Sequence, residues 1–155
     1  MKNAMPFPTS LSGAVAVDHV TVEQAIDRLE RALAQAKAVA IRRDDTAVRF
    51  RGGVFRLVSS SNILGPISNG VLEVSPSANG VSVRYRVTFT QLLVIVTLMV
   101  GAFLGPFVMT ELNIPRAGGL AILAVAWLWL FGGNFVLTRL RFPAFLVRSL
   151  ARPPG

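Results

Sequence analysis

The sequence predicts an α+β membrane protein, in which a small cytoplasmic domain precedes a two-helix transmembrane hairpin and a short interfacial C-terminal helix. The first observation is a pair of uncharged apolar segments at residues 91–110 and 118–137. A helix rises about 1.5 Å per residue, so roughly 20 apolar residues cross a hydrocarbon core about 30 Å thick. The second observation is that residues 21–90 change from helical to alternating apolar periodicity, which is typical of a helix followed by strands.

We expect residues 1–20 to form a flexible lead-in to this domain. Pro6 and Pro8 interrupt the apolar run that a signal peptide needs, and only residues 14–17 are continuously apolar before Asp18. The first apolar segment of the hairpin is therefore expected to direct insertion into the membrane.

An amphipathic helix is predicted to begin after Thr21. Thr21 and Gln24 have the spacing of a capping box, in which each side chain satisfies a backbone donor of the other residue. The apolar side chains that follow recur every three or four residues and form one stripe: Val22, Ala25, Ile26, Leu29, Leu33 and Ala36. The other side mixes both signs of charge, whereas a membrane-lying helix has a mainly basic one. We expect the helix to pack on a sheet, with docking to a partner as the alternative.

Roughly four strands of an antiparallel sheet are predicted in the remainder of this domain. Their expected ranges are 47–51, 54–59, 70–75 and 80–88. The last strand alternates cleanly between apolar residues and polar residues such as Arg84 and Arg86, so one face should be buried and the other wet. Because this strand enters the first apolar segment with almost no linker, the domain should be held at the membrane surface.

The short polar segment at residues 111–117 is expected to be an extracytoplasmic loop between the two spans. Backbone polar groups in lipid must be satisfied within the segment, so both spans should be helices. The limits of the second span stay open, since it starts as early as Ile114 or ends as late as Leu137. The uncertainty comes from Trp127 and Trp129, which would lie mid-span in the later placement, although tryptophan prefers the membrane interface.

Positive charge predicts the orientation of the hairpin. Of the 16 lysines and arginines, eleven precede the first span, one lies in the loop and four follow the second span. By the positive-inside rule, both termini are therefore cytoplasmic, and we expect a cell membrane of the bacterial inner-membrane type.

The basic segment at residues 138–155 should form the interfacial helix. The apolar side chains expected to enter the membrane interface are Phe142, Phe145, Leu146, Val147 and Leu150. The arginines expected to contact anionic lipid head groups are Arg84, Arg86, Arg139, Arg141, Arg148 and Arg152.

Small residues in both spans predict close helix packing. Thr97, Gly101 and Gly105 recur every four residues on one face of the first span, and small residues at this spacing let another backbone approach. The residues at about the same depth in the second span are Ala117, Ala121 and Ala124. These six residues are expected to pack either within the hairpin or against another molecule.

Neither a catalytic motif nor a metal or nucleotide motif is recognisable in the chain. It has no cysteine, and its one histidine, His19, cannot make a multi-histidine site. We therefore expect no cofactor and no enzymatic activity, although a membrane enzyme that uses His19, Asp44 and Asp45 is a third hypothesis. The net charge of +8 is explained by membrane topology, so nucleic acid is not an expected partner.

The function that these observations favour is an accessory or scaffold subunit. It would bind a membrane complex or itself through its helices and its membrane-apposed domain. The alternative is a subunit of a transport or channel assembly, with Glu111, Asn113 and Asn134 near the pathway. The expected partners are thus anionic lipid and another membrane protein or a second copy.

Overall fold

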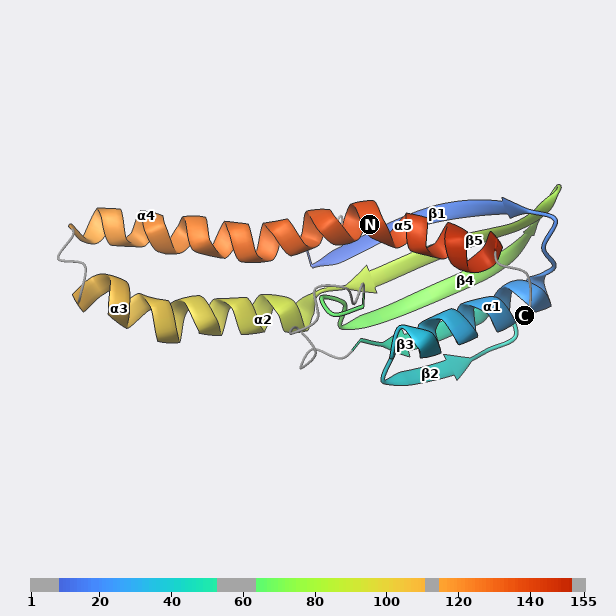
Figure 1. Ribbon diagram of the computed structural model, residues 1–155, viewed down its shortest axis with the longest axis horizontal. Helices are drawn as coiled ribbons and strands as arrows, with labels where there is room; N and C mark the ends of the chain where they lie inside the picture. The colour runs from blue at the N-terminus through green and yellow to red at the C-terminus, as the bar shows by residue number, and fades with distance from the viewer. Residues whose placement is uncertain (1–8, 53–63, 111–114, 152–155) are drawn as a thin grey trace, which may run out of the picture.

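The computed structural model describes residues 9–52, 64–110 and 115–151. A pair of long helices projects from one end of a sheet, which gives the molecule an elongated shape (Figure 1). The sheet and its first helix are formed by β1 (Ser10–Asp18), α1 (Val22–Gln35), β2 (Ala40–Arg43), β3 (Ala47–Arg51), β4 (Asn69–Ser77) and β5 (Gly80–Thr88). The α+β class predicted from the sequence is confirmed.

The sheet has five antiparallel strands in the order β1-β5-β4-β3-β2. Sequence reasoning predicted roughly four strands, and the range 54–59 lies outside the described residues. Two of the observed strands were not predicted, β1 and β2. In particular, residues 10–18 were expected to be a flexible lead-in, but they pair along their whole length with β5, from Ser10 opposite Thr88 to Asp18 opposite Gly80.

The strand β1 escaped prediction because its side chains are small and its alternation is weak. Gly13 shows why one position must be small: a Cβ atom there would clash with the ring of Tyr85 on the neighbouring strand. Glycine in a sequence often indicates a flexible segment, but Gly13 instead allows two strands to pack closely.

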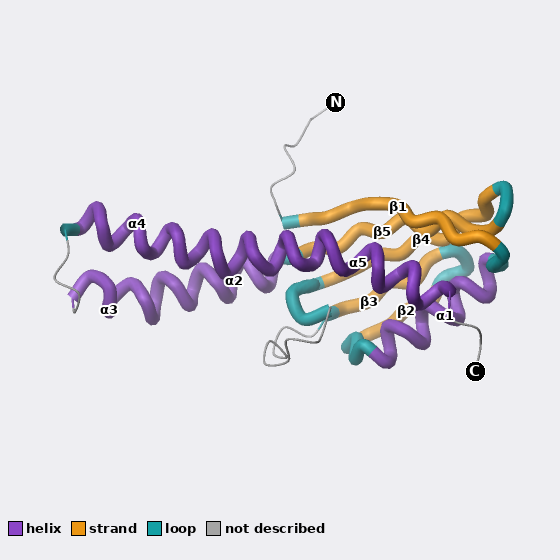
Figure 2. Tube along the Cα trace, turned by 45° about the horizontal axis from the view of Figure 1, so that its top comes forward, coloured by secondary structure: helices purple, strands orange, loops and turns teal. Residues whose placement is uncertain are grey.

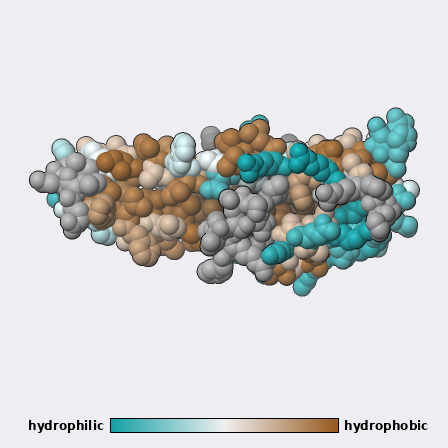
Figure 3. Space-filling model, viewed as in Figure 1, coloured by the Kyte–Doolittle hydropathy of each residue, from teal (hydrophilic) through white to brown (hydrophobic). Residues whose placement is uncertain are grey.

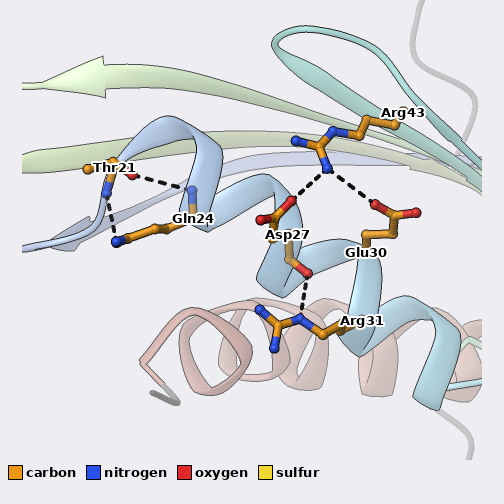
Figure 4. Close-up of polar contacts among 6 residues, drawn as sticks. All are labelled: Thr21, Gln24, Asp27, Glu30, Arg31 and Arg43. Carbon is orange, nitrogen blue, oxygen red and sulfur yellow. Dashed lines mark hydrogen bonds and ion pairs between the residues drawn. The ribbon is translucent and has the colours of Figure 1, made fainter. Parts of the chain in front are cut away.

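One face of the sheet is covered by α1 and by the C-terminal part of the second long helix (Figure 2). The predicted alternation of β5 is confirmed, because Val81, Val83, Tyr85 and Val87 are buried and Arg84 and Arg86 are exposed. The predicted capping box is also present. Thr21 Oγ1 accepts from the Gln24 backbone N–H at 3.3 Å, and Gln24 Oε1 accepts from the Thr21 N–H at 3.5 Å (Figure 4).

The first long helix is formed by α2 (Thr90–Leu98), the π-helical turn η2 (Met99–Leu104) and α3 (Gly105–Thr110). The second is formed by α4 (Arg116–Trp127), the π-helical turn η3 (Leu128–Gly132) and α5 (Gly133–Ala151). Both are long and apolar enough to cross a membrane. The second is unbroken over 36 residues, so it is about 54 Å long. It continues past Leu137, the later end considered for its span, whereas Ile114, the earlier start, lies outside the described residues.

The separate interfacial C-terminal helix predicted from the sequence is wrong. Residues 133–151 continue the second long helix and lie on the sheet (Figure 1). Phe142, Leu146 and Leu150 were expected in the membrane interface but are completely buried between this helix, α1 and the sheet. The spacing of four residues correctly indicates an apolar stripe, but it does not say which surface the stripe covers.

Candidate functional site

The two long helices pack against each other through large side chains. The buried residues of the first helix are Leu92, Val96, Val100 and Val108, at multiples of four residues. In an α-helix this spacing drifts by about 40° at each step. The wider π-helical turn at Met99–Leu104 advances less per residue and brings Val108 back to the inward side. The hairpin contact is thus built from a four-residue period that the π-helical turn makes possible.

A polar contact joins the helices within the hairpin. The indole Nε1 of Trp127 donates to Thr97 Oγ1 at 3.1 Å. The Trp127 ring also stacks on Phe131 with ring centroids 5.1 Å apart. A tryptophan that is hydrogen-bonded in this way carries no unsatisfied donor, so its ring can lie among apolar side chains. Trp129 differs, because it is 80% exposed and points outward.

The structure does not bring the six predicted helix-packing residues together. Thr97 contacts the second helix through Trp127, but a Cβ at Gly101 would meet no atom within 4 Å. A Cβ at Gly105 would meet only the carbonyl oxygen of Val100, in the same helical arm. The remaining three are exposed: Ala117, Ala121 and Ala124. Within one chain these small side chains therefore leave open surface, available to lipid or to another molecule.

The outer surface of both helices is apolar (Figure 3). The large exposed side chains on it include Val94, Leu98, Met99, Phe103, Phe107, Leu120, Ile122, Val125, Leu128 and Trp129. Large apolar side chains gathered on one surface in this way are typical of a surface that contacts protein or membrane. It is the surface that hydrocarbon or another apolar helix would cover.

The second helix then enters the core of the domain. Phe142 lies edge-on to Tyr85, with ring centroids 5.2 Å apart, and stacks on Phe50 at 6.5 Å. The end of the helix is held by α1, because Arg28 Nη1 donates to the carbonyl oxygen of Leu150. That carbonyl has no partner within its own helix, so the arginine satisfies a group that the helix end leaves open. The long helix is therefore fixed to the domain by aromatic packing and by a cap.

The arginines predicted to contact lipid lie on two surfaces. Arg84 and Arg86 are exposed on the uncovered face of β5, whereas Arg139, Arg141 and Arg148 are exposed on α5. Arg152 lies outside the described residues. A different arginine, Arg43, forms an ion pair with Asp27 at 2.6 Å and a longer one with Glu30 at 3.7 Å (Figure 4). All three side chains are about half exposed, so this pairing adds little stability.

The residues considered for chemistry are distributed over the domain and the hairpin. His19 follows β1, with a positive φ of 60°, and Asp44 and Asp45 lie exposed between β2 and β3. Asn134 Nδ2 donates to the carbonyl oxygen of Leu130 in its own helix at 2.7 Å. Glu111 and Asn113 lie outside the described residues. No group of three or more metal-ligating side chains occurs in the part of the chain that the structure describes.

Among the described residues, Tyr85 is the one group whose pKa the fold clearly shifts. Burial raises the pKa of the Tyr85 hydroxyl above its ordinary value of 10.0, and the nearby Arg139 guanidinium opposes this shift only in part. The pKa of Tyr85, a residue of β5, therefore depends on how closely α5 packs over it.

No family model, no curated protein and no solved structure matches the chain. Sequence reasoning missed the hydrogen bond between Trp127 and Thr97 and the cap formed by Arg28. The available sequence signal for the hairpin contact was the large apolar residue at every fourth position, Leu92, Val96 and Val100. This face of the helix lies beside the predicted face of small residues. No sequence signal connects Arg28 to Leu150, because the two residues are 122 positions apart.

Proposed function

We propose that the chain is a non-enzymatic integral membrane protein that serves as an accessory or scaffold subunit, and that it binds a membrane complex or a second copy of itself. The observation that carries this proposal is the apolar outer surface of the paired helices. The apolar part of the first helix, Thr90–Val108, has 19 residues, and its length of about 28 Å matches a hydrocarbon core. The outward side chains at this depth would contact lipid or a partner's helices.

The distribution of arginine supports an orientation with the domain in the cytoplasm of a bacterial-type cell. Arg84 and Arg86 precede the first span, and Arg139 and Arg141 follow the second, all four at the end of the hairpin next to the domain. The positive-inside rule assigns this end to the cytoplasm and the connection around residues 111–117 to the other side. Arginines within a Debye length of an anionic surface contribute about 1 kcal/mol each, so Arg86, two residues before the end of β5, would also help to anchor the domain.

The continuous second helix supports a scaffold role over a tethered one. The helix Arg116–Ala151 belongs to the hairpin at one end and to the domain core at the other. A partner bound to the hairpin is thereby held at a fixed position relative to the domain. Such a rigid unit can place two parts of an assembly, in the membrane and above it, at a defined distance.

Native mass spectrometry of the tagged protein, purified from its own membranes in a mild detergent, tests this function. We expect a stoichiometric companion protein or a defined homo-oligomer. A bare monomer in every mild detergent tried would contradict the proposal.

A matched pair of variants locates the contact. Gly101→Leu and Gly132→Leu each place a side chain where a Cβ meets no atom within 4 Å, so neither disturbs the isolated fold. We expect Gly101→Leu to weaken association and Gly132→Leu to leave it intact, because Gly101 lies on the small-residue face of the first helix. If both variants associate normally, this face is not the contact.

A further inference from the structure

The face of the sheet opposite α1 and α5 is strongly basic. Alternation along the strands places five exposed arginines on it. These residues define the basic face: Arg42, Arg49, Arg51, Arg84 and Arg86. Between β1, β4 and β5 it contains a shallow depression of about 620 Å³, lined among others by Ser12, Val71, Glu73, Arg84 and Arg86. None of the described elements covers this face.

The described residues leave the basic face with an excess of positive charge. Arg42 and Arg49 lie directly opposite each other on neighbouring strands, and like charges in this arrangement destabilise a sheet. None of the five arginines forms an ion pair with any described residue. Arg43, which points to the other face, is by contrast supplied with both Asp27 and Glu30. Glu73, directly opposite Arg84, and Asp18 are the acidic side chains of the described strands on the open face, and neither forms an ion pair with the five arginines. The open face thus keeps an excess of positive charge, whereas Arg43 on the covered face is paired.

We propose that the basic face docks an acidic surface on the cytoplasmic domain of a neighbouring membrane protein. This inference rests on the proposed function, because it names the surface and the charge by which such a partner is recognised. An acidic partner would relieve the repulsion between Arg42 and Arg49. Charge complementarity of this kind gives specificity and speeds encounter between two proteins held in the same membrane.

The geometry disfavours lipid as the main occupant of this face. The strands run broadly along the axis of the hairpin, so the face stands upright on the membrane (Figure 1). Arg84 lies four residues before the end of β5 at Thr88, a distance of about 14 Å along the strand. The potential of an anionic surface falls off within a Debye length of about 8 Å. By the strand register, Arg42 and Arg49 lie level with Arg86, two residues before Thr88, so lipid would meet only the hairpin-side end of this upright face.

Two other occupants fit less well. Single-stranded nucleic acid is bound by stacking its bases on aromatic side chains, whereas the residues between the arginines on this face are of other kinds, such as Ser12, Val71 and Ser82. A second copy would bring the same charge to the contact. Two of the acidic residues such a copy could offer, Asp27 and Glu30, are engaged by Arg43.

Photo-crosslinking in the native membrane tests this docking surface. A benzophenone amino acid replaces Ser82, which lies on the basic face next to Arg84, and, as the control, the exposed Ala34 on α1. We expect the Ser82 variant to crosslink to another membrane protein at a peptide rich in aspartate and glutamate, identified by mass spectrometry. Crosslinks to lipid, to nucleic acid or to a second copy would each overturn the proposal, as would the absence of a product.

Charge reversal supplies the second readout. Arg84→Glu should lower the Ser82 crosslink yield about tenfold or more, because like charges are then opposed in the contact. Arg31→Glu makes the same change of net charge on exposed α1 and should leave the yield unchanged. A lysine placed at the mapped acidic residue of the partner should restore the Arg84→Glu yield. A companion seen by native mass spectrometry but not reached from Ser82 would refute the basic face and leave the proposed function standing.

Discussion

The two halves of the helix Arg116–Ala151 place their side chains in opposite ways. In the hairpin half, large apolar residues such as Val125 and Trp129 point outward, and Trp127 turns its polar group inward to Thr97. In the domain half, Phe142, Leu146 and Leu150 point inward, and arginines are interleaved with Leu140 and Val147 on the outside. One backbone thus serves two surroundings, and the reversal of polarity marks where the proposed bilayer ends.

At the junction between the two halves, polar side chains form hydrogen bonds within the helix, and an aromatic side chain packs at the same level. Asn134 bonds the carbonyl oxygen of Leu130 at 2.7 Å, and Thr138 Oγ1 donates to that of Asn134 at 2.8 Å. Both therefore satisfy their polar groups within the helix. Phe135 lies at the same level and packs against Phe89, with ring centroids 5.3 Å apart. The change of surroundings is thus accommodated without a break in the helix.

The largest expected effect comes from the inward side of the domain half. Phe142→Ala should lower the free energy of unfolding by about 3–5 kcal/mol, because it opens a cavity where the side chain is now fully buried. Chemical denaturation in mild detergent, followed by circular dichroism, measures this. Leu140→Ala is the control, since Leu140 is 69% exposed. Equal losses in both variants would mean that α5 does not pack on the sheet as described.

A smaller effect is expected in the hairpin half. Trp127→Phe keeps an aromatic ring against Phe131 but removes the donor to Thr97. Hydrogen bonds between membrane helices contribute about 0.6 kcal/mol on average and up to about 1.7, and this is the expected loss in denaturant titrations of the detergent-solubilised protein.

The controls for this bond are Trp129→Phe and the double variant with Thr97→Val. Trp129 makes no hydrogen bond with the described residues, so its replacement should cost less. The effect of Trp127→Phe should disappear once Thr97 is already valine. A full additional loss in the double variant would show that the bond does not form.

The smallest effect concerns the pH dependence of the domain half. The pKa of Tyr85 is raised in the folded chain, so the unfolded state ionises first as the pH rises. The stabilising contribution is complete below pH 10.0, the ordinary value, and is lost as the pH rises through the higher folded pKa. Tyr85→Phe should therefore reduce the alkaline loss of stability.

Tyr85 is the only tyrosine in the chain, so the ultraviolet absorbance of tyrosinate reports on it directly. We expect its titration to lie above that of free tyrosine and to return to the ordinary value in Phe142→Ala, which uncovers the ring. A titration at the ordinary value in the unsubstituted protein would contradict the burial of Tyr85 beneath α5.

Several elements could be predicted because their signals are local. The capping box of Thr21 and Gln24, the alternation of β5 and the two apolar segments each depend on neighbours within a few residues. The α+β class follows from these alone. The predicted positions of the arginines also hold for Arg84 and Arg86, which are exposed as the alternation requires.

The remaining features depend on contacts between distant parts of the chain. β1 is defined by its register with β5, and Gly13 makes sense only beside Tyr85. The stripe of Phe142, Leu146 and Leu150 suits a membrane interface as well as a sheet, since both bury apolar side chains. The inward face of the first helix was misjudged because the small residues Thr97, Gly101 and Gly105 recur with the same four-residue spacing as the buried Leu92, Val96 and Val100, so the spacing alone does not distinguish the two faces.

The position of Phe142, Leu146 and Leu150 has a consequence for biosynthesis. These residues complete the core of a domain whose other parts lie before both apolar segments. A ribosome therefore delivers them only after the whole hairpin has been synthesised. In the proposed topology, the strands and α1 keep an uncovered apolar surface until the second helix has returned across the membrane. Completion of the domain is thus tied to correct insertion, and a chain with a failed hairpin would keep an exposed core that chaperones and proteases recognise.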